Sequence, residues 1–76
     1  MNKKEISKLE KTCWEGIYSI EDSIKLERKY NETKQESDLL ASIAKFNYAE
    51  GINQVLVSIN YKSDSMKKLN ELIGRC

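Results

Sequence analysis

The sequence predicts an all-α protein in which two long antiparallel helices form a hairpin and a short third helix follows. Three observations lead to this prediction. Pro is absent and only three Gly occur, so little interrupts a helical backbone. Apolar residues recur at helical spacing through residues 3–30 and again through 64–74. Between these stretches, residues 39–61 are almost entirely uncharged, with Lys45 and Glu50 as the exceptions.

The first helix is expected over about residues 3–30. Asn2 followed by Glu5 is the pattern of a capping box, which marks a helix N-terminus. We expect the helix to end at Tyr30 and Asn31, because Asn readily takes the left-handed conformation that closes a helix. Its apolar stripe, with Trp14 and Tyr18 beside it, consists of Ile6, Leu9, Cys13, Ile17, Ile20 and Ile24.

The second helix is expected over about residues 34–61. Thr33 followed by Glu36 again matches a capping box, and so short a connection makes the two helices antiparallel. A strand over residues 55–59 is the alternative, but no second strand is evident to pair with it. An ordinary surface helix has one apolar stripe, whereas this one has two on opposite sides. The stripes are Leu39, Ile43, Phe46, Val57 and Tyr61, and Ala41, Ala44, Tyr48, Ile52, Val55 and Ile59.

The third helix is expected over about residues 64–74, with Ser63 or Asp64 as its N-cap. The clustering of serines with Asp64 favours a break between the second and third helices at residues 62–65. A competing interpretation is one uninterrupted helix over residues 34–74. It is favoured by a seven-residue spacing that continues across the break, through Ile52, Ile59, Met66 and Ile73.

Two glycines and two cysteines carry further expectations. Gly16 and Gly51 fall near the middle of the two long helices, where Gly costs about 1 kcal/mol relative to Ala. We expect a close helix crossing there, or a notch that admits a partner's side chain; the alternative is exposed glycines that are merely tolerated. Cys13 lies in the apolar stripe and is expected to be buried. A Cys13–Cys76 disulfide is compatible with three helices but is disfavoured in the cytosol, and Cys76 is equally able to cross-link two chains.

The composition argues against several classes of function. One third of the residues are charged but the net charge is only +1, so the strongly basic face of a nucleic-acid or membrane binder is not expected. The chain has no His and no Gly-rich phosphate loop, so we expect no enzyme activity, metal, cofactor or small-molecule ligand. The N-terminal stretch is charged and lacks an apolar run, which predicts a cytoplasmic protein without a membrane segment.

A single domain over residues 1–76 is near the size at which one core supplies only a few kcal/mol. We therefore expect a homodimer and a protein–protein interaction module, a small adaptor, inhibitor or regulator of phage or bacterial origin that docks helix on helix. A nucleic-acid-binding regulator using the Lys-rich face of the first helix, and a structural subunit of a homo-oligomer, are the alternatives. The residues predicted to bind the partner are Trp14, Tyr18, Phe46, Val57 and Tyr61.

Overall fold

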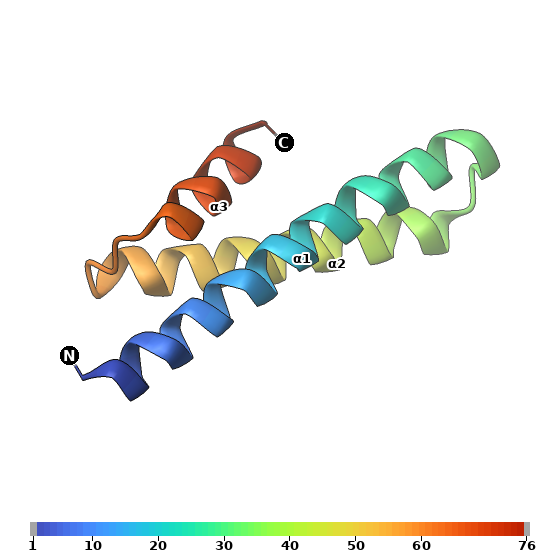
Figure 1. Cartoon of the computed structure of the whole chain (residues 1–76). Coiled ribbons are helices and arrows are strands. Elements are labelled where there is room, and N and C mark those ends of the chain that lie inside the picture. Colours follow the sequence, from blue (N-terminus) through green and yellow to red (C-terminus); the bar gives the residue numbers. More distant parts are fainter. Residues whose placement is uncertain (1, 76) are drawn as a thin grey trace.

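The computed structural model describes residues 2–75 and contains three helices, α1 (Lys3–Thr33), α2 (Glu36–Ser58) and α3 (Asp64–Arg75). α1 and α2 form an antiparallel hairpin, and α3 turns back beside only one half of it (Figure 1). The molecule is elongated, with extents of 46 × 19 × 16 Å. No strand occurs among the described residues, so the predicted all-α fold of three helices is confirmed.

Two of the predicted helix starts are formed by side-chain caps. The Asn2 side-chain oxygen accepts a hydrogen bond from the Glu5 backbone N–H at 2.9 Å. The Ser63 hydroxyl accepts one from the Met66 backbone N–H at 3.1 Å. In each case the cap satisfies an N–H group that has no partner within its own helix. The break before α3 is therefore real, and the alternative of one helix from 34 to 74 is wrong.

The turn between α1 and α2 differs from the prediction in its details. α1 does not end at Asn31 but continues to Thr33, and Lys34 takes the left-handed conformation with φ at 60°. The Lys34 backbone N–H donates to the Tyr30 carbonyl at 2.7 Å, which closes the helix. The Lys34 ammonium also lies 5.5 Å from the centre of the Tyr30 ring. This cation–π contact offsets part of the cost of a left-handed Lys.

The predicted capping box at the start of α2 is also wrong. The N-cap residue of α2 is Gln35, whose side chain makes no capping hydrogen bond. Instead, the Thr33 hydroxyl accepts from the Gln35 backbone N–H at 3.3 Å and donates to a carboxylate oxygen of Asp38 at 3.1 Å. Asp38 is buried, and Lys29 lies 3.6 Å from its other oxygen. The turn is therefore held by side-chain bonds around one carboxylate.

α2 ends at Ser58, three residues before the predicted end at Tyr61. The helix is closed by a Schellman motif in which Asn60 takes the left-handed conformation with φ at 60°. The Asn60 N–H donates to the Val57 carbonyl at 2.9 Å, and the Tyr61 N–H donates to the Leu56 carbonyl at 3.0 Å. The Tyr61 and Leu56 side chains then pack in the same core cluster, the apolar contact that accompanies this motif.

The core lies where the three helices meet. Gly16 marks the closest approach, because a Cβ added there would lie 3.2 Å from side-chain atoms of both Ile52 and Leu69. The predicted close crossing is therefore confirmed at Gly16 but is wrong at Gly51, which has nothing within 4 Å of an added Cβ. The largest cluster of buried core residues is Cys13, Ile17, Leu56, Tyr61, Met66 and Leu69. Cys13 is thus buried as predicted, whereas Cys76, the other cysteine, lies outside the described residues.

Candidate protein-interaction surface

The seam between α1 and α2 consists largely of small side chains in the half of the hairpin near the turn. The Ser23 hydroxyl donates to the Ser42 carbonyl at 2.8 Å, and the Ser42 hydroxyl donates to the Ser23 carbonyl at 2.9 Å. The Ser19 hydroxyl donates to the Lys45 carbonyl at 2.8 Å. Direct bonds from one helix's side chains to the other's backbone require the two backbones to lie close together. A seam this narrow leaves little room for large apolar side chains.

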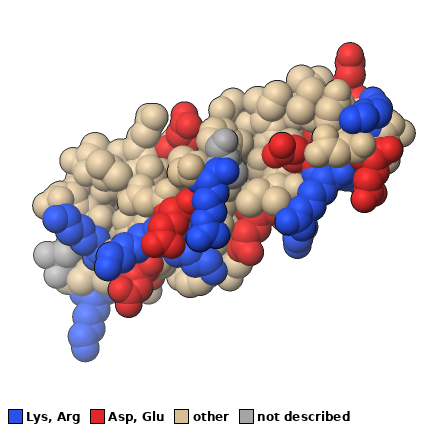
Figure 2. Space-filling model, turned by 90° about the horizontal axis from the view of Figure 1, so that it is seen from above, with Lys and Arg blue, Asp and Glu red and all other residues tan. Residues whose placement is uncertain are grey.

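The large apolar side chains of α2 therefore point outward. The buried residues of α2 are Asp38, Ser42, Ala49 and Leu56, of which only Leu56 is a large apolar residue. In the view of Figure 2, many charged side chains lie along one long edge of the molecule, while the opposite edge is uncharged over much of its length and carries charges of both signs at one end. At least 45% of the surface of each of the following large apolar side chains on and just after α2 is exposed: Leu40, Ile43, Tyr48, Val55, Val57 and Ile59.

One outward face of α2, here called the Tyr48 face, is uncharged along its whole length. On a helical projection its members fall within an arc of about 100°. A groove of about 610 Å³ between α1 and α2 runs beside Ala41, Ala44 and Tyr48, and Tyr18 lines its α1 side. A second groove of about 430 Å³ continues past Tyr48 to Gly51. The Tyr48 face consists of Leu40, Ala41, Ala44, Tyr48, Gly51, Val55 and Ile59.

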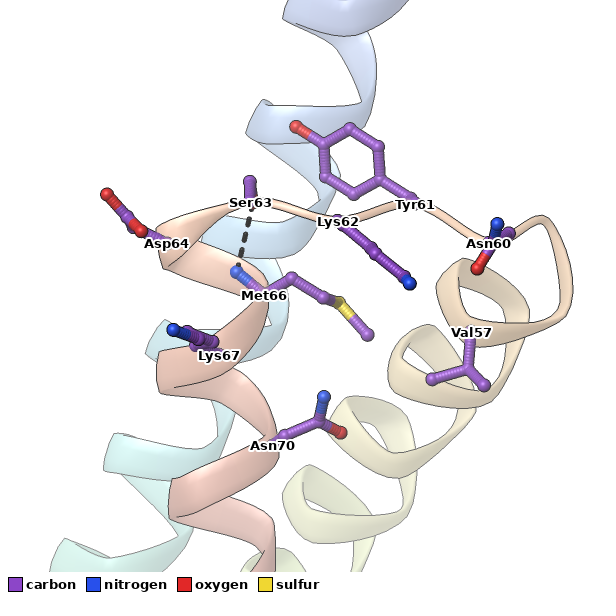
Figure 3. A pocket seen from close by; sticks show the side chains of 9 residues that line it. All are labelled: Val57, Asn60, Tyr61, Lys62, Ser63, Asp64, Met66, Lys67 and Asn70. Carbon is purple, nitrogen blue, oxygen red and sulfur yellow. Dashed lines mark hydrogen bonds between the residues drawn. The ribbon is translucent and has the colours of Figure 1, made fainter.

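The other outward face, here called the Phe46 face, consists of Leu39, Ile43, Phe46 and Val57. Val57 is exposed and borders a groove of about 450 Å³ between the end of α2 and α3, shown in Figure 3. The Met66 and Asn70 side chains reach into this groove from α3, whereas the Tyr61 ring is turned away from it (Figure 3). The Phe46 face is thus shortened by α3 at one end.

The five predicted partner-binding residues do not form a single surface. Trp14 and Tyr18 lie one turn apart on α1 with their ring centres 5.7 Å apart. Trp14 is half-buried against the core, and the Lys68 ammonium of α3 lies 5.1 Å from its ring centre. Tyr18 is exposed and borders the Tyr48 face, whereas Phe46 is half-buried on the opposite face of α2.

Tyr61 departs most from its predicted place. It lies after the end of α2, and only 8% of its surface is exposed because it packs in the core. Its hydroxyl donates to one carboxylate oxygen of Glu10, and the Ser65 hydroxyl donates to the other. Tyr61 therefore holds α1 against the start of α3 within one chain, and its side chain is not part of the exposed surface of α2.

This Glu10 cluster was not predicted from the sequence. Hydrogen bonds from Ser65, Tyr61 and Ser63, in that order of effect, hold the Glu10 pKa below its ordinary value. Burial and then the Glu10 charge raise the pKa of the neighbouring Cys13 thiol. Glu10 lies beside the apolar stripe of α1 among many similar acidic residues, so helical spacing gives no signal that distinguishes it. Its partners are Tyr61, in the loop before α3, and Ser65, in the first turn of α3, which lie 51 and 55 residues further along the chain.

No group of three or more His, Cys, Asp or Glu side chains within residues 2–75 is placed to hold a metal ion. None of the helices in the described part of the chain combines the length and apolar character needed to cross a membrane. Comparisons with protein-family models, curated proteins and solved structures found no match to this chain. The physical character of the α2 surface is therefore the basis for a functional proposal.

Proposed function

We propose that this protein acts by docking the outward faces of α2 against helices of another protein molecule, as a small non-enzymatic adaptor, inhibitor or regulator. The single observation that carries the proposal is the row of exposed large apolar side chains along α2. Contiguous apolar surface is rare on soluble monomers and is typical of sites where another protein binds. Self-association belongs to the same proposal, because a second copy of the chain is able to cover the same faces.

Helix-on-helix docking fits the shape of this surface. The members of the Tyr48 face from Ala41 onward recur at spacings of three and four, which is the pattern with which an amphipathic helix binds a groove or another helix. Tyr18 and Tyr48 on either side of the longer groove are the type of residue that most often anchors a protein interface. The nucleic-acid alternative has less support, because acidic and basic side chains alternate along the charged edge (Figure 2).

The proposal is tested by placing one charge on each outward face in turn. We expect Val55→Glu, on the Tyr48 face, or Ile43→Glu, on the Phe46 face, to abolish a complex that the wild type forms. Both side chains are exposed, so the fold should survive, as judged by circular dichroism. Glu27→Lys, on the exposed surface of α1, is the control for a change of charge away from α2 and should leave the complex intact.

The readouts are molar mass by light scattering over a range of concentrations and co-purification with proteins of the native host. The proposal is wrong if the wild type stays at the monomer mass of 8.8 kDa and retains no host protein. The same conclusion follows if a complex forms and neither α2 variant weakens it.

A further inference from the structure

We propose that the Tyr48 face is covered by a second copy of this chain. The two α2 helices lie antiparallel about a two-fold axis, and Tyr48 of each copy packs over Gly51 of the other. This inference rests on the proposed function and deepens it by naming the partner, the face and the register of the contact.

Gly51 is the first reason. It lies within α2, where Gly is the least favourable residue after Pro, and no described residue beyond its own stretch of helix approaches within 4 Å of an added Cβ. Gly16, by contrast, is required by the crossing within the chain. Gly51 also lies on the Tyr48 face, less than one helical turn from the exposed Tyr48. A second copy would explain why residue 51 is Gly, because the absence of a side chain there leaves room for the Tyr48 ring of the other copy.

The sequence of the Tyr48 face is the second reason. When two copies of the face are aligned antiparallel, large side chains of one copy lie opposite small side chains of the other. Placing Tyr48 opposite Gly51 in an antiparallel pair brings Ala44 opposite Val55. A large side chain thus meets a small one at four positions of the two-fold contact, which is what close packing of two helices requires. At the two ends of the face, Leu40 meets Ile59, so both extremities close with apolar contacts. A parallel pair would instead set Tyr48 against Tyr48 and Gly51 against Gly51.

The charges along α1 are the third reason. Asp22 borders the groove at the level of Ala41 and Ala44, whereas Glu15 borders it at the level of Tyr48, close to the proposed two-fold axis. Lys8 and Lys11 lie on the same side of α1 as Glu15, within about 40° on a helical projection, towards the N-terminus of α1. The antiparallel register brings Asp22 of one copy to the level of Lys8 of the other. Such complementarity favours a pair of copies with opposite directions.

The exposed area of the chain is the fourth reason. The solvent-accessible surface is 5470 Å², whereas a folded monomer of this mass is expected to expose about 4,800 Å². The excess is of the same order as the ~800 Å² that each partner contributes to a standard protein interface. One elongated chain therefore exposes an additional area comparable to what a stable dimer buries.

Gly51→Leu is the decisive variant, because it separates the monomer from the dimer. A Cβ added at Gly51 has no other described residue within 4 Å, so helix content and thermal stability of the monomer should be unchanged or raised. In the dimer the leucine side chain would occupy the space of the other copy's Tyr48, so the Kd of the dimer should rise at least about tenfold. Light scattering over a dilution series measures this Kd. Gly74→Leu is the matched control at another open glycine, on α3, and should leave the dimer intact.

A compensating change tests the contact itself. Adding Tyr48→Ala to Gly51→Leu removes the ring that the leucine displaces, so the double variant should recover most of the lost affinity. If the weakening by Gly51→Leu had another cause, removing Tyr48 would lower the affinity further, and the inference would be wrong.

The antiparallel register is tested by cross-linking in a background with Cys13→Ala and Cys76→Ser. Ala44→Cys and Val55→Cys chains carrying different tags should be joined to each other by a short bismaleimide. Neither should join to itself, because in this register the like positions lie about 16 Å apart along the helix axis. Self-joining of each variant would mean a parallel pair and would overturn the proposal.

The outcomes also separate this inference from the proposed function. If the dimer survives Gly51→Leu and is lost in Ile43→Glu, docking through α2 stands but uses the Phe46 face, and the inference is wrong. If the wild type is a monomer that binds a foreign protein through α2, the inference again fails alone. If the wild type forms no complex at all, both fail.

Discussion

In the half of the hairpin that α3 covers, the buried side chains are mainly apolar, whereas in the half near the α1–α2 turn they include Ser23, Ser42 and Asp38. The first half is three helices thick and encloses the largest core cluster (Figure 1). The second half is only two helices thick. Two packed helices have no enclosed interior, so hydrogen bonds and an ion pair hold the seam there, and large apolar residues face outward.

This difference shows where the stability of a small chain comes from. Apolar burial requires neighbours on several sides, and only the covered half supplies them. Hydrogen bonds in a narrow seam contribute less, because each replaces a bond to water. The covered half should therefore determine the free energy of unfolding, while the turn half remains available for contacts with another chain.

The largest expected effect is the loss of a core side chain in the covered half. Ile17→Ala removes a fully buried isoleucine and should lower the free energy of unfolding by about 3 kcal/mol. Ile43→Ala makes the same change on the exposed surface of the turn half and should cost about 0.5 kcal/mol. Urea titration followed by circular dichroism measures both values.

A small domain has little stability to lose, so Ile17→Val, with an expected cost of about 1 kcal/mol, replaces Ile17→Ala if the latter does not fold. These measurements are made below the concentration at which the chain self-associates. Equal costs at positions 17 and 43 would contradict the assigned difference between the two halves.

A smaller effect is expected from the seam of the turn half. Ser23→Ala and Ser42→Ala should each lower the free energy of unfolding by about 1 kcal/mol, because each removes a buried hydrogen bond to the other helix. The double variant should cost less than the sum, since the two hydroxyls also lie 3.1 Å apart and act as a unit.

Ser58→Ala is the control for the seam variants. Its hydroxyl bonds only to the Val55 carbonyl within the same helix and is exposed, so the change should be within about 0.5 kcal/mol. Strict additivity of the two seam variants would mean that the serines do not act together, and costs no larger than that of Ser58→Ala would mean that the seam contributes little.

The fold was predictable because its signals are local. Helical spacing in residues 3–30, the Asn2 cap and the serines before α3 each depend on residues close together in the sequence, and all three predictions agree with the structure. The helix ends were predicted less well. Asn31 and Asn60 are equally suited to the left-handed conformation, yet only Asn60 adopts it, because side chains around Asp38 move the first turn to Lys34.

The candidate surface was predictable only in part. The two apolar stripes of α2 predict neighbours on two sides of the helix. In the structure the buried side of α2 is instead the side of Ser42, Ala49 and Leu56, which belong to neither stripe. Which aromatic residues remain exposed depended on tertiary contacts. Tyr61 is taken into the core by Glu10, and Trp14 is covered by packing against the core and by Lys68. Neither contact can be predicted from the local sequence pattern, because the residues involved lie far apart in the sequence.

The smallest expected effect concerns the polar contact at the end of the covered half, where Glu10 joins α1 to Tyr61 and Ser65. The folded chain holds the Glu10 pKa below its ordinary value of 4.5. The cluster therefore stabilises the fold fully above about pH 4.5, and this contribution is lost as the pH falls through the lower pKa of the folded state. Wild-type stability should decrease more steeply in that range than that of Glu10→Gln.

Gln closely matches Glu in shape but does not titrate. The difference between the pH–stability curves of the wild type and Glu10→Gln therefore isolates the contribution of Glu10 from that of the other carboxylates. Titration of the Glu10 carboxyl by NMR gives a direct check, and Tyr61→Phe should move its pKa upward by removing one donor. A Glu10 pKa at or above 4.5 in the folded chain would mean that the cluster does not stabilise the charged form. The link between α1 and α3 would then depend on apolar packing alone, and the covered half would contain no polar contribution of the kind that holds the turn half.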